Sequence, residues 1–374
     1  MRKTMTLSIG LLLVTFCLKA QEDSIPQKYY DFVEKLDSST NAGNPTFWEQ
    51  GIHKQKLKAK CQRITKKPFN ESQTIFLNKI VDQIGKNIAT KLFASLEDGF
   101  YENIHIFRKN NAIHAVFRIF SISEGLNYHE MILAEDNGEV FIRDIYIYLA
   151  GEYLSETIVR VTQMIQKDSE IIKHWYILQK ARNLGAQHKV PEAYELIKQL
   201  PEDMMNNKII LLNVLQILSR DELKHENLFL KVFNKYESLF PNDPSLILLK
   251  LDVYLINKQY HKVIESVDAL SKAVRNDVFL NYVKAMAFLE LEQYDKIISL
   301  AKHMIQNNHY TPLAYILILN AYYYQNKFQE FLATLIEYSQ SELTTFKELV
   351  DEKEYPNFYA SQVWKDYQAK QKKD

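Results

Sequence analysis

The sequence contains few cysteines, glycines and prolines, and neither sign of charge is in excess. Its 374 residues include 2 Cys, 9 Gly and 9 Pro, and 46 basic side chains balance 46 acidic ones. This balance argues against a nucleic-acid-binding protein, which normally carries a basic excess on one face. One local exception is the run of seven Lys or Arg in residues 53–67. We interpret it as a solvated loop or helix face, with a basic patch for an anionic surface as the alternative.

Motifs of common catalytic and metal sites are also missing. The sequence has no HExxH, no cysteine cluster, no GxSxG and no glycine-rich phosphate loop. After the N-terminal segment, no run reaches the roughly 18 to 20 apolar residues that a membrane helix needs. We therefore expect a non-enzymatic protein without a metal, a cofactor or a membrane span.

The N-terminus has the residue order of a secretory signal peptide. Two basic residues precede the apolar run MTLSIGLLLVTFCL, and Lys19-Ala20 and the polar stretch QEDS follow it. A basic start, an apolar centre and a small residue at the end are typical of a segment that is removed on export. We expect residues 1–20 to be removed after Ala20, which makes the mature protein periplasmic or secreted.

The two cysteines, Cys17 and Cys61, determine whether a lipid anchor or a disulfide is available to the mature chain. Cys17 suggests a lipid anchor as an alternative, although the bulky Phe16 stands where a lipid-attachment sequence has a small residue. Cleavage after Ala20 leaves only Cys61, so the mature chain has no intramolecular disulfide or cysteine metal site. The fold must then depend on packing.

Residues 21–152 combine helical and strand patterns. Helical periodicity is present around 26–36 and 72–95, and Asn70 suits the N-cap of the second helix. Four segments of period two follow: ENIHIFRK, AIHAVFRIFSI, LNYHEMILAE and EVFIRDIYIYLA. The breaks between them are NN, EG and NG, and Asn137-Gly138 is a strong hairpin signal. We predict an α+β domain with a four-stranded antiparallel meander.

Two-residue turns at all three breaks predict which side chains share a face of this sheet. The face towards the helices then holds Ile104, Ile106, Ile113, Ala115, Phe117, Ile119, Ile132, Phe141, Ile145 and Ile147. The other face holds His105, His114, Arg118, Phe120, His129, Asp144, Tyr146 and Tyr148.

On that second face, Arg118, His129, Asp144 and Tyr146 form a candidate ligand pocket. The predicted register places His129 beside Phe120 and Tyr146. A histidine near a carboxylate and tyrosines is suited to acid–base work near neutral pH. The alternative is a half-exposed sheet surface, or a docking face for the rest of the chain. Helices followed by a curved meander look like cystatin-like or nuclear-transport-factor-like shapes, which can hold a pocket against the sheet.

The C-terminal half contains an internal repeat. Tyr260, Tyr294 and Phe328 are 34 residues apart, and an aromatic residue precedes each of them by six positions. Units that start at Pro244, Val278 and Pro312 each provide two amphipathic helices. A single helix pair cannot bury both of its apolar faces, so such units stack on one another.

This spacing resembles the tetratricopeptide repeat family over residues 170–340, with a looser unit at 174–207 and a two-residue slip after it. The resemblance implies an α-solenoid over 153–340 whose first helices line a groove for a protein or peptide. The family has small residues at the positions of Leu251, Val263 and Phe331. The larger side chains at these positions in this sequence put the curvature of the solenoid in question. The groove residues that the resemblance implies for partner binding are Phe279, Tyr282, Met286, Leu289, Asn320, Tyr323 and Tyr324.

Residues 341–374 form the end of the chain and contain two further helical stretches. Stacked repeats need a terminal unit with a polar outer face, so we expect capping helices with Trp364 as their buried anchor. Taken together, the sequence predicts an exported, non-enzymatic scaffold that binds a protein partner through the repeat groove. The alternative is a small-ligand-binding or catalytic α+β domain that the repeats position.

Overall fold

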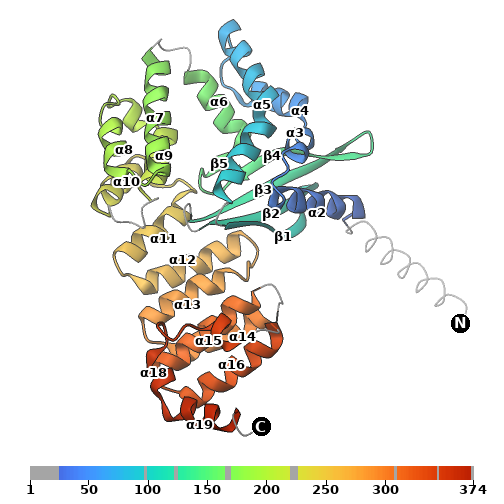
Figure 1. Ribbon diagram of the computed structural model, residues 1–374. Coiled ribbons are helices and arrows are strands. Elements are labelled where there is room, and N and C mark those ends of the chain that lie inside the picture. Colours follow the sequence, from blue (N-terminus) through green and yellow to red (C-terminus); the bar gives the residue numbers. More distant parts are fainter. Residues whose placement is uncertain are drawn as a thin grey trace, which may run out of the picture. The chain divides into compact units, whose positions relative to one another are not determined.

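The computed structural model describes residues 25–96, 99–121, 125–164, 170–219, 226–306, 310–342 and 345–371. The predicted signal peptide, including Cys17 and Ala20, lies outside these ranges. The chain is mainly helical, with an antiparallel sheet in its N-terminal part (Figure 1). It divides into two compact units, the first ending at Leu249 and the second beginning at Lys250. The α+β domain predicted from the sequence ends at residue 152. The first unit extends further and also contains several of the later helices.

The sheet of the first unit is a meander of five antiparallel strands in chain order. The turns Asn110-Asn111 and Asn137-Gly138 join strands through residues with φ of 48° and 59°, and of 51° and 87°. Two successive positive φ values produce the twist that matches the flanking strands. The predicted meander is confirmed, with one short strand added. The strands are β1 (Gly99–Lys109), β2 (Ala112–Ser121), β3 (Gly125–Asp136), β4 (Glu139–Ile147) and β5 (Glu152–Tyr153).

The predicted register between β2 and β3 was wrong. Ser121 pairs with Gly125, so three residues rather than two separate these strands, and His129 lies opposite Phe117 instead of Phe120. A shift by an odd number of residues moves every side chain of β3 to the other face. His129 therefore lies on the side that faces the helices.

Two β-bulges change the pattern further. The pairing of β1 with β2 shifts at Ile104, and that of β3 with β4 shifts at Arg143. Each bulge adds one residue to one strand and reverses the alternation beyond it. Ile104, Ile132 and Phe141, which the sequence assigned to the core face, are absent from the main core cluster. The predicted core residues Ile113, Ala115, Phe117, Ile119 and Ile145 are confirmed, and the strands add Tyr101, Met131, Leu133 and Ile142 to this cluster.

Five helices cover the core side of the sheet (Figure 1). The predicted cap of α5 is confirmed, because the Asn70 side chain accepts from Gln73 N at 2.9 Å and Gln73 Oε1 accepts from Asn70 N at 3.1 Å. Helix α3 was not predicted, and α4 carries most of the basic run in residues 53–67, which the sequence assigned to a loop or a helix face. The helices are α2 (Gln27–Asn41), α3 (Thr46–Gly51), α4 (Lys54–Ile64), α5 (Glu71–Ser95) and α6 (Leu154–Met164).

Most of the later helices pack on the next helix along the chain. The second helix of each predicted pair begins at Tyr260, Tyr294 and Phe328, as the 34-residue period indicates. The first unit continues with α7 (Glu170–Ala186), α8 (Val190–Ile197), the short 3-10 helix η1 (Met204–Asn206), α9 (Lys208–Leu218) and α10 (Glu226–Leu239). Helix α11 (Leu246–Ile256) spans the division, and the second unit continues with α12 (Tyr260–Ala273), α13 (Leu280–Glu290), α14 (Tyr294–Ile305), α15 (Thr311–Tyr324) and α16 (Phe328–Glu342).

The turns inside these three pairs have one conformation. Lys258, Glu292 and Asn326 have φ of 53°, 56° and 54° and are spaced by the same 34 residues. In the first turn, the next residue, Gln259, donates its N–H to the carbonyl of Tyr254 at 2.8 Å, and the other two turns repeat this bond at 2.9 Å. A left-handed residue followed by this six-residue closure is the Schellman ending of a helix. The repeat is therefore present in the backbone as well as in the sequence.

The same turn joins α7 to α8 in the first unit. His188 has φ of 58°, and Lys189 donates its N–H to the carbonyl of Leu184 at 2.9 Å. His188 precedes Lys258 by two periods of 34 residues plus the two-residue slip that the sequence indicates after residues 174–207. The looser unit thus ends its first helix in the same way.

The C-terminal helices α17 (Phe346–Leu349), α18 (Pro356–Ala360) and α19 (Gln362–Gln371) pack on α15 and α16. Phe358 is fully buried, and its ring centroid lies 4.3 Å from that of Phe331. Trp364 is only half-buried, with its ring near those of Phe358 and Tyr367. The buried anchor of this end is Phe358 rather than Trp364.

We predict that Glu292→Gly stabilises the protein. Glu292 is exposed and has a left-handed backbone, which costs a residue with a Cβ about 1 kcal/mol that glycine avoids. Urea unfolding should show a rise of about 1 kcal/mol in the free energy of unfolding. The matched control, Lys296→Gly, lies on the exposed face of α14 and should lower it by about 1 kcal/mol. Destabilisation by both substitutions would contradict the turn conformation.

Candidate functional site

The four residues of the predicted sheet pocket do not form one cluster. Arg118 and Tyr146 extend from the face opposite the helices, whereas His129 lies on the helix-facing side. Asp144 follows the bulge in β4 and is bound by residues of two helices. The corrected register and the bulge at Arg143 account for this separation, so no shared acid–base site exists among these four side chains.

Asp144 is a structural anchor. Its buried carboxylate accepts from the Ser155 side chain at 2.6 Å and from Ser155 N at 3.2 Å, and it pairs with Lys60 of α4. A buried carboxylate is stable only when it is paired and hydrogen-bonded. These contacts hold α4 and the start of α6 on the edge of β4.

Arg118 and Tyr146 also have structural partners. Arg118 is fully buried, pairs with Glu102 and lies 5.0 Å from the ring centroid of Phe100. Tyr146 packs edge-on against Tyr148 and Tyr153, with centroids 5.2 Å away in each case. Burial, with nearby carboxylates, raises the pKa of Tyr146 to about 12. Tyr146 is therefore unsuited to proton transfer near neutral pH.

Sequence reasoning missed a buried histidine–carboxylate pair on the same face as Tyr146. His114 Nδ1 lies 2.7 Å from Glu130 Oε1, and the Tyr148 hydroxyl donates to Glu130 Oε2 at 3.3 Å. Burial raises the pKa of Glu130, but the hydrogen bond from His114 and the charge of Lys109 outweigh it and leave this pKa below its usual value. Only the corrected register brings these residues together.

His129 lines a cavity between the sheet and two helices, and we call this the inner cavity. Its volume is about 410 Å³. Most of its wall is aliphatic, and it is lined by Ile80, Ile84, Asn87, Ile88, Lys91 and Leu92 of α5, Leu154, Thr157, Ile158 and Val161 of α6, Ile119, Gly125, Asn127, His129, Ile147 and Leu149 of the sheet region, and Gln216 of α9.

The His129 ring is a polar group in this apolar wall. Its Nδ1 atom is buried and has no hydrogen-bond partner, and the hydroxyl of Tyr101 nearby is in the same condition. The two ring centroids are 6.1 Å apart. Desolvation lowers the pKa of His129 to about 4, so the imidazole is neutral at pH 7. A buried polar atom without a partner costs about 1 to 3 kcal/mol of stability.

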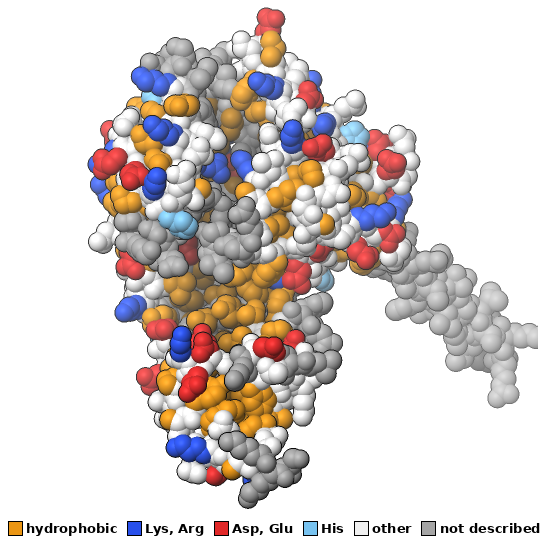
Figure 2. Space-filling view, in the orientation of Figure 1, with side chains coloured by type: hydrophobic (Ala, Val, Ile, Leu, Met, Phe, Trp, Pro, Cys, Tyr) orange, Lys and Arg blue, Asp and Glu red, His pale blue; other side chains and the backbone are white. Residues whose placement is uncertain are grey.

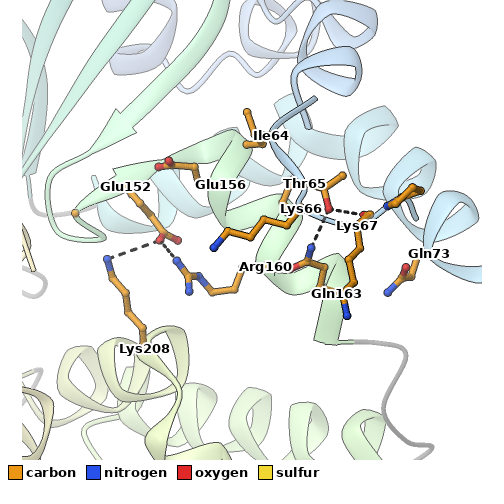
Figure 3. A pocket seen from close by; sticks show the side chains of 13 residues that line it. Ile64, Thr65, Lys66, Lys67, Gln73, Glu152, Glu156, Arg160, Gln163 and Lys208 are labelled. Carbon is orange, nitrogen blue, oxygen red and sulfur yellow. Dashed lines mark hydrogen bonds and ion pairs between the residues drawn. The ribbon is translucent and has the colours of Figure 1, made fainter. Parts of the chain in front are cut away.

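A polar cleft of about 1030 Å³ lies on another side of α6 (Figure 3). Lys66, Lys67 and Glu152 line it. The carboxylate of Glu152 is already paired with basic side chains of the protein. Glu152 is bonded by Arg160 at 2.7 Å and lies 3.7 Å from Lys208 of α9 (Figure 3). Lys208 in turn pairs with Asp243 at 2.5 Å. The buried charges of this cleft thus compensate one another and join α6 to α9.

The predicted groove residues of the second unit have different surroundings. Phe279 is buried against Tyr282 and Tyr310, whereas Met286 is 41% and Tyr324 is 56% exposed. Leu289 is partly buried.

The remaining two groove residues contact the C-terminal cap. Asn320 accepts a hydrogen bond from the Tyr355 hydroxyl at 2.8 Å, and the Tyr323 hydroxyl accepts from Asn357 N at 3.4 Å. The Tyr323 and Tyr355 rings pack edge-on with centroids 5.2 Å apart. The protein's own C-terminal segment therefore covers this end of the predicted groove.

The helical residues of the inner cavity were missed by sequence reasoning. Ile80, Ile84, Ile88 and Leu92 recur every four residues along α5, a pattern that predicts only a helix with one apolar face. Ile84 and Leu92 belong to the main core cluster, and Ile80 and Ile88 pack against it. The sequence pattern therefore gives no sign of a cavity beside these residues.

No protein-family model, curated protein or solved structure matches the chain. Within the described ranges, no three His, Cys, Asp or Glu side chains gather so that they could hold a metal ion. None of the helices described has the length and apolar character needed to cross a membrane.

We predict that His129 makes the protein acid-sensitive. The pKa of His129 is about 4 in the folded state and about 6.5 in the unfolded state, so only the unfolded chain gains a proton as pH falls through this window. Stability is complete above pH 6.5 and falls towards pH 4. Between pH 7 and pH 4.5, His129→Phe should therefore lose about 2 kcal/mol less stability than the wild type in urea unfolding.

The matched control is His261→Phe, because His261 is exposed on α12. It should leave the pH dependence of the wild type unchanged. An equal acid-induced loss in the wild type and in His129→Phe would show that His129 is not buried as a neutral group.

Proposed function

We propose that the second unit binds a protein or peptide partner along its first helices, α11, α13 and α15, and that the protein acts as an exported interaction scaffold. The observation that carries this proposal is the position of its exposed apolar side chains. In the described part of the second unit, the exposed large apolar side chains are Leu255, Met286, Ile316 and Tyr324. Each lies on one of the first helices, α11, α13 and α15.

These four side chains, which we call the first-helix face, have the composition of a binding surface. Their exposed fractions are 38%, 41%, 36% and 56%. Hydrophobic side chains gather over the helices of this unit, with charged side chains around them (Figure 2). Exposed apolar groups of this kind mark interaction sites, and Met and Tyr supply large contact area that adapts to a partner.

The repeated backbone geometry supports the tetratricopeptide-like arrangement. The left-handed turns at Lys258, Glu292 and Asn326 recur at the period of the aromatic residues. Identical turns orient each second helix in the same way against its first helix. The first helices then present equivalent positions in succession, and an extended partner can contact several units at once.

The C-terminal cap limits the surface that a partner can occupy. Asn320 and Tyr323 are engaged by Tyr355 and Asn357. The bond from the Tyr355 hydroxyl also holds the Asn320 side chain against the cap. We therefore favour a partner that presents apolar side chains rather than a free C-terminus.

Site-specific photocrosslinking tests this proposal. A photoreactive residue at Met286 and at Tyr324 should crosslink the same partner from cell-envelope extract, which mass spectrometry identifies. The same residue at the control positions Glu265 and Lys302, exposed on the second helices α12 and α14, should not crosslink it.

The identified partner then permits a quantitative measurement. Met286→Asp combined with Tyr324→Asp should weaken its binding at least tenfold, about 1.4 kcal/mol, because two charges replace apolar contacts. Unchanged affinity, or equal crosslinking from the control positions, would contradict the assignment of the first-helix face.

A further inference from the structure

Strand β1 is an edge of the described sheet, where it pairs with β2. A sheet edge carries backbone N–H and C=O groups that lack a neighbouring strand, and proteins usually cover them. Helix α2 lies beside β1 and covers its first half (Figure 1). The Asn41 side chain donates to Tyr101 O at 2.7 Å and accepts from Tyr101 N at 3.2 Å, and Asp37 accepts from Asn103 N at 2.8 Å. Helix α2 thus supplies the bonds that another strand would make.

The second half of β1, beyond the bulge at Ile104, lacks this cover. The two-residue turn after β1 makes Lys109 and Ala112 a hydrogen-bonded pair of the hairpin. Alternate residues of a strand bond in opposite directions, so Ile106 and Arg108 direct their N–H and C=O groups away from β2. Within the described ranges, no hydrogen bond is made to these outward groups. They are therefore available to an added strand.

An open cavity of about 450 Å³ lies between α2 and this part of the edge. It is lined by Tyr30, Val33, Glu34, Asp37 and Ser38 of α2, and by Asn103 and Ile106 of β1. We call this cavity, together with the outward backbone of Ile106 and Arg108, the edge groove. A strand added to the edge would turn every second side chain towards α2, and the one beside Ile106 would enter the cavity.

The charged side chains that line this cavity are acidic. Glu34 is exposed and Asp37 is partly buried. Burial raises the pKa of Asp37 above its usual value, the nearby charge of Glu102 adds to this effect, and the hydrogen bond from Asn103 N only partly offsets it. A basic group in the cavity would stabilise both carboxylates. The Tyr30 ring offers an apolar surface for the aliphatic part of a Lys or Arg side chain.

Arg108 limits where a basic residue of an added strand can lie. It is exposed and lies two residues beyond Ile106, on the same face of β1. Like charges on neighbouring strands repel, so the basic residue is favoured beside Ile106 and disfavoured beside Arg108. The same repulsion disfavours a second copy of β1 as the added strand, because antiparallel pairing would bring the two Arg108 side chains close together.

We propose that the edge groove binds an extended polypeptide segment as an added β-strand, with a Lys or Arg side chain of that segment beside Glu34 and Asp37. Backbone bonds to Ile106 and Arg108 would hold the segment, and the cavity would select the basic side chain. This site belongs to the first unit and is independent of partner binding along α11, α13 and α15.

Selection of phage-displayed random nonapeptides on the full chain, followed by fluorescence anisotropy with the synthetic peptides, tests this proposal. Enriched peptides should carry a Lys or Arg among β-branched residues. Arg108→Pro removes an outward N–H, which a sheet edge tolerates, and should weaken their binding roughly tenfold or more. The matched control Arg108→Ala keeps this N–H and should change the affinity less than about threefold.

A second pair of variants tests the cavity without altering the backbone. Glu34→Lys should remove the enrichment of Lys and Arg and weaken binding roughly tenfold, whereas Glu49→Lys, exposed on α3, should do neither. A library that yields no binder, or only peptides indifferent to both Arg108→Pro and Glu34→Lys, would overturn the proposal. A dimer of the wild-type chain that Arg108→Pro dissociates in sedimentation would also overturn it, because a second copy would then occupy the edge.

Discussion

The pairing of β2 with β3 determines which side chains of the sheet face the helices. Because Ser121 pairs with Gly125, Phe117 and His129 lie opposite each other on the covered side. Met131 and Leu133 follow on the same side and complete the core under α2 to α6. A register that differed by one residue would place His129 on the other face and turn Ile132 towards the helices in its place. The cavity and its one unpartnered imidazole both depend on this pairing.

The sequence predicted the two hairpins correctly because the residues of each turn determine its conformation. Asn110-Asn111 and Asn137-Gly138 tolerate positive φ, and both hairpins form as predicted. The connection through residues 122–124 has no such signal, because several loop lengths fit its composition equally well. The bulges at Ile104 and Arg143 depend on tertiary packing rather than on local preference. Every wrong face assignment follows from these three places.

The helical half was predicted better because its signal is periodic. Tyr260, Tyr294 and Phe328 mark the start of each second helix, and the structure places the helix boundaries there. The left-handed turns were not predicted, because lysine and glutamate, the residue types at Lys258 and Glu292, rarely adopt positive φ. The sequence left residues 53–67 open between a loop and a helix face, because α4 buries only Leu57 and Cys61 and so short an apolar pattern does not distinguish the two.

The two units offer surfaces of different chemistry. The second has exposed apolar side chains on its first helices, and the first has a cavity beside His129 with a mostly aliphatic wall. The cavity of the first unit depends on the position of His129. Nuclear Overhauser contacts of the His129 ring measure that position directly. Contacts with Tyr101 and Ile147 are expected. Contacts with Phe120 and Tyr146 in their place would contradict the register and place His129 outside the inner cavity.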